Sequence, residues 1–524
     1  MEAMKLVTAA QMRSIEQACV EAGVSLDELM ENAGLAVAEY IRDGSASPGR
    51  SGITGKIYGK RIVILIGPGN NGADGFVAGR HLARWGAVVT AVLCVKRKSP
   101  DPKRELAEQA GVSIFDGISE SGNESLSEKL ATADIVVDAV LGTPASRPIS
   151  KPLSSLLITV VESDVPVVAL DLPTGLNSDT GEFDIAGLPA DLTLLLGYPK
   201  LGPAVEAGSA PTGETVVLDI GIPFGLDSHV KAELLTDDLA VSLQPERPPD
   251  SHKGTFGSTL IIGGSQGFPG AVTLTTDAAT RSGVGLTFVA TPEPVYRLVA
   301  GDVPEAIYRG LPVSANGEVE PSAAARTALE LAARADSVVI GPGLGQNPAT
   351  SEFLSILLSQ IDDELPLVLD ADALNILSHT HKWWERLENR AALTPHPGEM
   401  GRLMGISTAE VQQDRAAVVL EAARKFNRVV VLKGAATLIA APDGRLRVSE
   451  WVNSGLAKGG SGDVLAGLLG GLLAQQPDNL FDMASLALFV HGYAAEAARV
   501  ELGETGMRAT DVSDRLGYFY RDRT

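Results

Sequence analysis

The sequence is poor in cysteine, in aromatic residues and in positive charge. Two cysteines among 524 residues, Cys19 and Cys94, argue against a disulfide framework and fit a reducing compartment. Aromatic residues make up 5% of the chain while glycine occurs 56 times, so we expect many tight turns rather than an aromatic-rich β architecture. Lys and Arg number 43 against 65 Asp and Glu, for a formal net charge of −22. Such an acidic surface repels nucleic acid and anionic membranes, and we expect neither as a partner.

Long hydrophobic runs are also missing. The longest, residues 464–474, contains several glycines and falls far short of the roughly 20 residues that span a bilayer. The first twelve residues include Glu2 and no apolar segment, so we expect no secretory signal and a cytoplasmic location. Hydrophobic residues reach 45%, which is enough for large cores. A chain of this length exceeds one ordinary domain, so two or more domains are predicted.

Strands and helices are predicted to alternate in the first half of the chain. Thr8 and Gln11 form a capping-box pattern before one helix, and Ser25 opens a second helix that runs to Ile41. A third helix is predicted at residues 74–85. Apolar segments typical of buried strands lie at residues 61–66, 88–95, 135–140, 165–170 and 192–196.

This alternation fades between residues 221 and 251 and then resumes, so we expect domains at residues 1–225 and 226–524. Strands interleaved with helices favour a mainly parallel sheet covered on both faces, and we therefore predict two α/β domains. The second series has predicted strands at residues 258–262, 286–290, 337–340, 365–369 and 428–432, and a hairpin at 437–441 and 445–448.

A turn rich in glycine and asparagine follows the first predicted strand. Residues 66–75 read Ile-Gly-Pro-Gly-Asn-Asn-Gly-Ala-Asp-Gly. Open α/β sheets bind ligands beyond the carboxyl ends of their strands, where free N–H groups of the next helix can hold a phosphate. A plain connecting turn is the alternative, but Asn70, Asn71 and Asp74 add polar groups that a connection does not need. We therefore interpret this turn as a binding site.

Two further strands of the first half end in oxygen-bearing side chains. Asp138 ends one, and Asp171 and Thr174 follow another. Each aspartate alone is more often a helix cap or a loop carboxylate than a catalytic group. Hard cations prefer carboxylate, amide and hydroxyl oxygens, so Asn71, Asp138 and Thr174 together favour a shared cation.

With these motifs, residues 8–40, 67–75, 138–148 and 171–175 resemble the NAD(P)H-hydrate epimerase family. The resemblance spans nearly the whole first half. It implies a Rossmann-like three-layer αβα domain that interconverts the R and S epimers of hydrated NADH and NADPH.

The same resemblance implies site residues. A potassium ion would be held by Asn71, Asp138 and Thr174, and Asp171 would be the acid or base at the hydrated ring. The residues that would contact the substrate are Asn70, Asn71, Gly72, Ala73, Asp74, Gly142, Thr143, Pro144, Ala145, Ser146, Arg147, Pro148 and Asp171.

The chain departs from the family pattern at two positions. Ala73 stands where the family usually has glycine, and alanine there would cost on the order of 1 kcal/mol if the backbone needed a positive φ. Pro144 replaces the second glycine of a Gly-Thr-Gly pattern and removes an N–H that a phosphate would use.

The second half carries its sharpest motif at residues 459–463, Gly-Gly-Ser-Gly-Asp, directly before a predicted helix. Successive N–H groups at a helix start form an anion cradle, and the positive end of the helix dipole favours an ionised Asp463. That combination supplies both stabilisation of a transferring phosphoryl group and a base for a hydroxyl. The alternative is an ordinary acidic residue in a first helical turn.

Other polar segments follow strands of the second half. His396 lies between two prolines that fix its backbone, although it would also fit a plain loop. Lys433 follows a strand but belongs to no Walker A loop, and it would meet phosphate only as a point charge or be an ordinary strand-end lysine.

Gly-Gly-Ser-Gly-Asp resembles the ribokinase-like superfamily. Together with residues 252–271, 341–345, 369–375, 393–400 and 433–437 it is similar to the ATP/ADP-dependent NAD(P)H-hydrate dehydratase family over essentially the whole second half. The resemblance implies a ribokinase-like αβα domain that uses ADP or ATP with Mg²⁺.

In this family pattern Asp463 would be the catalytic base. The residues expected at the hydrate are Ala271, Gly345, His396 and Asp463. Those expected at the nucleotide are Lys433, Gly434, Ala435, Ala436, Thr437 and Gly462.

We therefore predict a fused repair enzyme in which the first domain epimerises NAD(P)H hydrates and the second dehydrates the S form through a phosphorylated intermediate. We also expect a homo-oligomer. Two alternatives stay open at this point. One is a ribokinase-like kinase of a small vitamin alcohol or sugar with a non-catalytic first domain, and the other is a nucleotide-sensing or scaffold protein without turnover.

Overall fold

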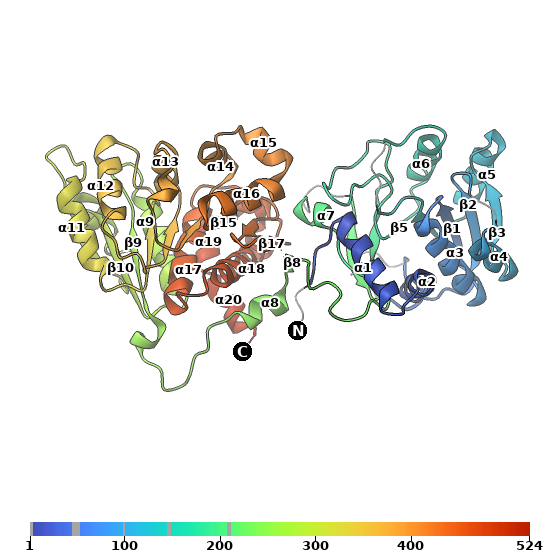
Figure 1. The fold of residues 1–524 in the computed structure, drawn as a ribbon, viewed down its shortest axis with the longest axis horizontal. Coiled ribbons are helices and arrows are strands. Elements are labelled where there is room, and N and C mark those ends of the chain that lie inside the picture. Colours follow the sequence, from blue (N-terminus) through green and yellow to red (C-terminus); the bar gives the residue numbers. More distant parts are fainter. Residues whose placement is uncertain (1–3, 45–52, 98–99, 144–147, 207–210, 524) are drawn as a thin grey trace. The chain divides into compact units, whose positions relative to one another are not determined.

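The structure is a computed structural model that describes residues 4–44, 53–97, 100–143, 148–206 and 211–523 (Figure 1). The chain divides into two compact units. The N-terminal unit is Lys5–Ala232, and the C-terminal unit is Met1–Met4 with Glu233–Thr524. The assignment of one activity to each of residues 1–225 and 226–524 stays a prediction.

The N-terminal unit is built on a seven-stranded sheet in which every neighbouring pair is parallel. Its order is β3-β2-β1-β4-β5-β6-β7. The strands are β1 Arg61–Ile66, β2 Val88–Leu93, β3 Ser113–Asp116, β4 Ile135–Ala139, β5 Val167–Leu170, β6 Leu192–Leu196 and β7 Glu214–Leu218. The helices are α1 Ala9–Glu21, α2 Leu26–Asp43, α3 Asn70–Arg84, α4 Pro102–Gln109, α5 Glu120–Leu130, α6 Leu153–Glu162 and α7 Leu201–Val205.

The side chains of β1, an interior strand of the sheet, alternate between its two faces and contribute to two separate cores in this unit. Ile62 and Ile64 of β1 pack into the cluster that includes residues of α1, α2 and α3. Val63 and Leu65 point to the other face and pack with residues of α5 and α6. Because successive side chains of a strand point to opposite faces, a strand that is apolar throughout must be covered on both sides. The three-layer arrangement follows from this pattern.

The order of this sheet reverses at its centre. β1 pairs with β2 on one side and with β4 on the other. The strands after β1 are therefore added first on one side of it (β2, β3) and then on the other (β4 to β7). In open parallel sheets the crevice beyond the carboxyl ends at such a switch point is where ligands bind. The start of α3 and the ends of β4 and β5 meet there.

The C-terminal unit contains a ten-stranded sheet of order β11-β10-β9-β12-β13-β14-β15-β16-β17-β8. Pairs from β11 to β15 are parallel, and β16 pairs antiparallel with both β15 and β17. The strands are β8 Ala232–Leu235, β9 Ser258–Ile262, β10 Leu286–Pro292, β11 Ile307–Leu311, β12 Ser337–Ile340, β13 Leu367–Leu369, β14 Ala391–Leu393, β15 Val429–Leu432, β16 Leu438–Ala440 and β17 Leu446–Ser449.

Helices cover this second sheet as well (Figure 1). They are α8 Asp237–Ser242, α9 Pro269–Arg281, α10 Glu293–Val299, α11 Pro321–Ala332, α12 Pro348–Leu358, α13 Asp372–Ser378, α14 Pro397–Met404, α15 Thr408–Gln413, α16 Arg415–Phe426, α17 Ser461–Gln475, α18 Leu480–Gly506, α19 Ala509–Ser513 and α20 Leu516–Arg521, with short 3₁₀ turns η1 Lys253–Phe256, η2 Trp383–Glu385 and η3 Ser454–Leu456.

Helix α17 is the central helix of this unit, and glycine allows its close packing. From Val464 to Ala474 every residue is buried. A Cβ on Gly467 would lie 2.0 Å from the carbonyl oxygen of Thr275 in α9, a distance that no side chain tolerates. The helix is therefore pressed against α9, and its first turn is fixed at the edge of the sheet.

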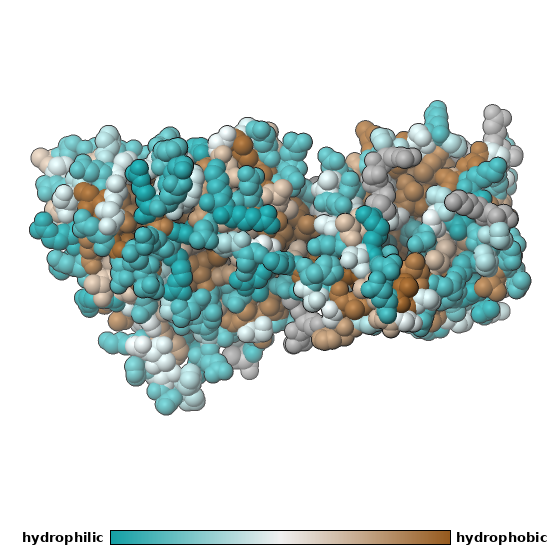
Figure 2. Space-filling view, viewed as in Figure 1, coloured by the Kyte–Doolittle hydropathy of each residue, from teal (hydrophilic) through white to brown (hydrophobic). Residues whose placement is uncertain are grey.

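The visible surface is mainly hydrophilic. On the face shown in Figure 2, hydrophilic residues cover most of the surface, and hydrophobic ones show mainly between them. Among the described helices, none has the length and apolar character that crossing a membrane requires. Cys19 and Cys94 are buried and free, which confirms the expectation of no disulfide.

Most predicted strands are confirmed, while the missed ones are short or polar. The strands at residues 61–66, 192–196, 258–262 and 337–340 have the predicted limits. Not predicted were β3, β7, β8, β11 and β14, which have three to five residues each. Helices α3 and α17 begin three or four residues before their predicted starts, because glycines of low helix propensity open both and resemble turn residues in the sequence.

Candidate active sites

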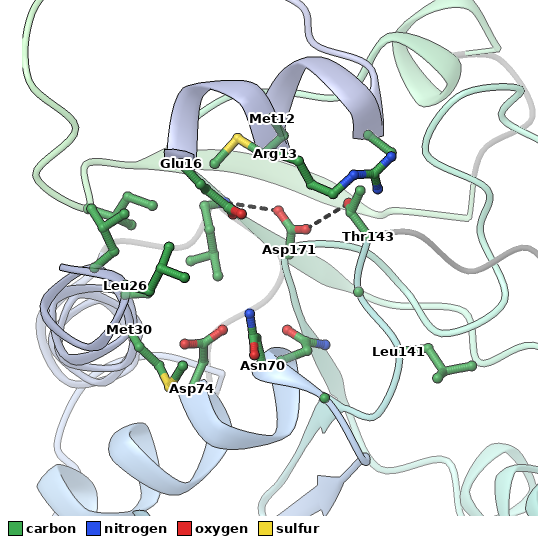
Figure 3. A pocket seen from close by; sticks show the side chains of 18 of the residues that line it. Met12, Arg13, Glu16, Leu26, Met30, Asn70, Asp74, Leu141, Thr143 and Asp171 are labelled. Carbon is green, nitrogen blue, oxygen red and sulfur yellow. Dashed lines mark hydrogen bonds between the residues drawn. The ribbon is translucent and has the colours of Figure 1, made fainter. Parts of the chain in front are cut away.

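A cavity of about 440 Å³ lies in the N-terminal unit (Figure 3). It lies at the carboxyl ends of β4, β5 and β6 and is bordered by α1, α2 and the first turn of α3. We call it the N-terminal cavity. Six predicted site residues line it, namely Asn70, Asn71, Asp74, Gly142, Thr143 and Asp171.

The first turn of α3 forms one wall of this cavity. The first N–H groups of α3, like those of any helix, have no intrahelical partner. Gly69 is the N-cap and provides no side-chain hydrogen bond to them. Gly67 must be glycine, because a Cβ there would lie 1.7 Å from the carbonyl oxygen of Val140. The guanidinium of Arg97 donates to the carbonyl oxygens of Gly67 and Gly69. This wall is therefore a rigid turn with free donors, suited to an anion.

Asp171 lies opposite this turn, at the end of β5. Its φ of 63° is in the left-handed region, where residues with a Cβ are strained. The hydroxyl of Thr143 donates to Oδ2 at 3.0 Å, and Nζ of Lys200 donates to Oδ1 at 2.5 Å. In Figure 3, Asp171 and Asp74 project into the cavity from opposite walls. Strain held by several contacts is typical of functional positions.

Three carboxyl groups share this cavity, and two have raised pKa values. Burial, followed by the negative charges of Asp171 and Glu16, raises the pKa of Asp74 well above its usual value. Burial and then Asp171 also raise the pKa of Glu16. A carboxyl group that stays protonated can donate a proton or a hydrogen bond. The cavity therefore combines a proton donor with the carboxylate of Asp171.

A second group of oxygens lies beside the cavity. Asp138 is fully buried, and its carboxylate accepts bonds of 2.7 Å from the N–H and from the hydroxyl of Thr174. Burial, opposed by these hydrogen bonds, raises the pKa of Asp138 to about 6. The side-chain amide of Asn71 is buried, and neither its oxygen nor its nitrogen has a partner among the described residues. A Cβ on Gly142 would lie 3.2 Å from Cγ of Asn71, which locates that amide beside the end of β4.

The remaining predicted residues of the first half lie elsewhere or outside the described residues. Gly72 and Ala73 are buried in α3 but do not line the cavity. The φ of Ala73 is not positive, so alanine causes no backbone strain at this position. Pro148 is exposed and does not line the cavity either. The predicted residues Pro144, Ala145, Ser146 and Arg147 fall outside the described residues.

A second cavity, of about 510 Å³, lies in the C-terminal unit between the ends of β13 and β15 and the start of α17. We call it the C-terminal cavity. It is lined by residues 456–463, which include the whole Gly-Gly-Ser-Gly-Asp motif. Other predicted site residues that line it are His396, Lys433 and Gly434, and unpredicted ones include Asp370 and Glu399.

Lys433 is the positive charge of this cavity. Its Nζ donates to Oδ1 of Asp370 at 2.8 Å. A Cβ on Gly462 would lie 3.2 Å from Nζ, so the ammonium lies directly beside the first turn of α17. Burial alone would lower the pKa of Lys433, but the carboxylates of Asp370 and Glu399 outweigh it and raise that pKa. A charged lysine beside free helical N–H groups is suited to bind a phosphate.

Asp463 lies in the first turn of α17 with its carboxyl in the cavity. Burial, and then the charge of Asp370, raises the pKa of Asp463 to about 7. A carboxylate with a pKa near the working pH is an effective general base. The pKa of Glu399 is likewise raised to about 7, mainly by burial.

His396 lines this cavity with a neutral ring. It is the N-cap of α14, and its Nδ1 accepts the N–H of Gly398 at 3.0 Å. Burial, and then Lys433 and Arg402, lowers the pKa of His396, which keeps the ring neutral. Since Nδ1 accepts, the proton of the neutral ring is on Nε2.

Five predicted residues of the second half do not line the cavity: Ala271, Gly345, Ala435, Ala436 and Thr437. Thr437 donates to the carbonyl oxygen of Gly434 at 2.9 Å, so this segment forms a turn beside Lys433. Gly345 is fixed by its N–H, which donates to Asp372 at 2.8 Å.

Sequence reasoning missed four residues that bear on the two sites. Lys200 and Glu16 line the N-terminal cavity, Glu399 lines the C-terminal one, and His491 lies behind α17 with Nε2 at 3.1 Å from the carbonyl oxygen of Ser461. Lys200 follows an apolar strand, and this position was the one available signal. Glu16 and His491 lie in amphipathic or apolar helices, where nothing distinguishes them from structural residues.

Comparison with protein families agrees with both halves of the chain. A family model described as NAD(P)H-hydrate dehydratase matches residues 259–517. A second model, described as YjeF-related protein N-terminus, matches residues 26–202.

Curated relatives match along the whole chain. The bifunctional NAD(P)H-hydrate repair enzyme Nnr of Moorella thermoacetica is 37% identical over 99% of this chain and 97% of its own length. The enzyme of the same name from Coxiella burnetii is 35% identical over 97% of each chain. Among solved structures, an ADP/ATP-dependent NAD(P)H-hydrate dehydratase from Bacillus subtilis, co-crystallised with ATP and Mg²⁺, is 33% identical. It aligns with 56% of this chain and 98% of its own, with a TM-score of 0.48.

Proposed function

The chain belongs to the family of bifunctional NAD(P)H-hydrate repair enzymes, and on that premise we propose how its two cavities divide the repair. The protein epimerises hydrated NADH and NADPH and dehydrates the S epimer with ADP or ATP. Epimerisation takes place in the N-terminal cavity and dehydration in the C-terminal one. The fusion is chemically sensible, because an S-specific dehydratase clears both epimers only if R converts to S.

Epimerisation needs proton transfer on both faces of the ring. Water adds to the enamine of a dihydronicotinamide so that the hydroxyl is on the carbon beside the ring nitrogen. To invert this carbon, its C–O bond breaks as the hydroxyl takes a proton and leaves as water. The nitrogen lone pair forms a C=N bond, and water adds to the other face and loses a proton. Asp171 takes the proton from the incoming water, and protonated Asp74 supplies one to the leaving hydroxyl.

The phosphates of the dinucleotide are held without basic side chains. The free N–H groups at the start of α3 meet the anion, and the guanidinium of Arg97 fixes the carbonyl groups of that turn away from it.

A potassium ion fits the oxygens beside this cavity. The partnerless amide of Asn71, the carboxylate of Asp138 and the hydroxyl of Thr174 would hold it. This oxygen-only set suits a hard cation. When bound, the ion would supply positive charge near the substrate and neutralise Asp138.

Loss of the potassium site should slow epimerisation and leave dehydration intact. We expect exchange of K⁺ for tetramethylammonium to lower the epimerisation rate at least about tenfold, and Asp138→Asn to make the rate insensitive to K⁺. Epimer interconversion is followed by chromatography, and the melting temperature with and without K⁺ gives a readout independent of activity. An unchanged rate and an unchanged melting temperature in the absence of K⁺ would rule out the site.

Dehydration proceeds through a better leaving group. Hydroxide leaves poorly at neutral pH, whereas phosphate leaves well. Asp463 takes the proton of the hydroxyl as its oxygen bonds to the terminal phosphorus of the nucleotide and the bond to the departing nucleotide breaks. The N–H groups at the start of α17 and Lys433 stabilise the transferring phosphoryl group. Phosphate then departs, the adjacent carbon loses a proton, and the dihydronicotinamide ring is restored.

The nucleotide is bound beside the same turn. We assign its contacts to Lys433, the turn at residues 434–437 and Gly462, with Mg²⁺ entering on the phosphates. His396 presents its Nε2–H to the hydrate as a neutral donor. Ala271 and Gly345 lie outside the cavity and would contact only parts of the substrate that extend beyond it.

The observation that carries this proposal is Asp463 at the start of α17 beside Lys433 and Asp370. The test is to incubate the protein with an R/S mixture of NADH hydrate, ATP or ADP, Mg²⁺ and K⁺, and to follow NADH absorbance. We expect full recovery. A stable phosphorylated product without NADH would instead indicate a kinase, and no nucleotide-dependent recovery would refute the proposal.

Dehydration should depend on pH through Asp463. Its pKa is raised to about 7, and the base must be ionised, so kcat/KM should fall below that value. We expect a decrease approaching tenfold per pH unit between about pH 6 and pH 5 and a plateau above about pH 8. The measurement is the initial rate of NADH formation from the S epimer at saturating nucleotide. A flat profile across this range would exclude Asp463 as the base.

A further inference from the structure

The carboxylate of Asp171 is held in a single orientation by groups from three other segments. Thr143 follows β4, Leu196 ends β6, and Lys200 precedes α7. The Leu196 N–H and Lys200 Nζ both donate to Oδ1, at 3.4 and 2.5 Å, while Thr143 donates to Oδ2 at 3.0 Å. Among the described residues, Oδ1 therefore has two donors and Oδ2 has one.

From this arrangement we propose that Lys200 is a positioning residue for epimerisation: it fixes Oδ1 of Asp171 so that Oδ2 meets the proton of the incoming water. The inference rests on the epimerase function proposed above and extends it to a residue that no motif identifies.

Lys200 is itself firmly held. Its side chain is 1% exposed, and Nζ also donates to the carbonyl oxygen of Tyr198 at 2.8 Å. The backbone on either side is tied to the strand-like segment before α1, through Val7 N to Pro199 O and Leu201 N to Val7 O. Two protons of the ammonium are thus directed at fixed acceptors, which hold the lysine side chain in one position.

The positive charge of Lys200 also offsets the negative charges around Asp171. Asp171 faces two other carboxyl groups, Glu16 from α1 and Asp74 from α3, with Arg13 also on the cavity wall. Without a buried cation the carboxylate of Asp171 would lie beside these groups with only neutral donors. Lys200 supplies that cation from behind, on Oδ1, and leaves Oδ2 accessible. A neutral donor in its place would orient the carboxylate less firmly.

The test compares Lys200→Met and Lys200→Arg in the full-length protein, with Lys60→Met as the matched control. Lys60 is a partly buried lysine of the same unit at the amino end of β1, away from the cavity. We expect Lys200→Met to lower the epimerisation kcat at least about 100-fold with KM changed less than about threefold, and Lys200→Arg to restore part of the loss. Hydrogen exchange of β1 and β6 peptides reports whether the unit stays folded.

A double variant separates positioning from independent roles. If Lys200 acts through Asp171, Lys200→Met combined with Asp171→Asn should be no slower than Asp171→Asn alone. Additive losses, a wild-type kcat in Lys200→Met, or a defect confined to KM would overturn the proposal. If Lys200→Met unfolds the unit, Lys200→Gln, which keeps an N–H donor, takes its place with the same expected order. An inactive wild-type epimerase site would instead contradict the proposed function and not this role.

Discussion

Replacing Asp463 by asparagine should all but stop nucleotide-dependent recovery of NADH, while epimerisation should continue at the wild-type rate. This is the largest effect we expect, a loss of about 10³- to 10⁴-fold in kcat. Asparagine has nearly the shape of aspartate but cannot take the proton of the hydroxyl. The carboxyl group lies in the first turn of α17, in the same cavity as Lys433. The measurement is the rate of NADH formation from the purified S epimer, with either ADP or ATP.

Two controls distinguish lost catalysis from lost structure. Asp238→Asn removes an exposed carboxylate from the first turn of α8 in the same unit, and it should leave dehydration unchanged. Nucleotide affinity of Asp463→Asn, measured by equilibrium dialysis, should stay within a few-fold of wild type. Retention of more than about a tenth of the wild-type kcat would show that another group accepts the proton.

Asp171→Asn stops repair part-way. Its dehydratase site still consumes the S epimer, so NADH absorbance rises rapidly to the S fraction and then follows only spontaneous epimerisation. We expect the enzymatic epimerisation rate to fall by about 10²- to 10⁴-fold, because the amide cannot take a proton from water. The amide would also lose the ion pair with Lys200, whose side chain is 1% exposed. The progress curve at limiting hydrate therefore shows two phases where wild type shows one.

Asp164→Asn is the matched control for this variant. Asp164 is exposed and, like Asp171, is an aspartate with a left-handed backbone, at φ 55°. Both substitutions therefore change the same backbone preference, but only one lies in the cavity. A single-phase curve for Asp171→Asn, or a two-phase curve for Asp164→Asn, would be inconsistent with Asp171 as the acid or base.

The architecture was predictable because buried parallel strands leave a simple signal. Unbroken apolar segments such as residues 61–66 and 192–196 have few alternatives in an α/β protein. β14 has three residues, and β3 has no buried residue, so neither carries a hydrophobic pattern strong enough to recognise. The starts of α3 and α17 were placed too late because glycine is a poor helix former. At the start of α3 glycine is required, since a Cβ on Gly72 would lie 2.3 Å from the carbonyl oxygen of Gly67.

The candidate site was predictable where chemistry follows a strand directly. Asp463 was identified because it follows four small residues at the start of a helix, and Asp171 because its strand end matches the epimerase family pattern. Lys200 was not, since its partner is 29 residues away and only the fold brings them together. Gly345 and Ala271 show the opposite error, because a motif match alone does not say which side chains border the cavity.

Left-handed backbone at residues other than glycine occurs at both candidate sites, and also outside them, as at Asp164. Asp171 follows β5, Ala371 lies between Asp370 and α13, and Ala436 lies in the turn after Lys433. Each such residue costs of order 1–3 kcal/mol and persists because its surroundings hold it. Glycine at Ala371 or Ala436 would relieve that strain, so selection for thermostability should favour substitutions at these two positions. Variants selected there for heat resistance alone should have a higher melting temperature and a lower kcat. These two alanines would then show a trade-off between stability and activity.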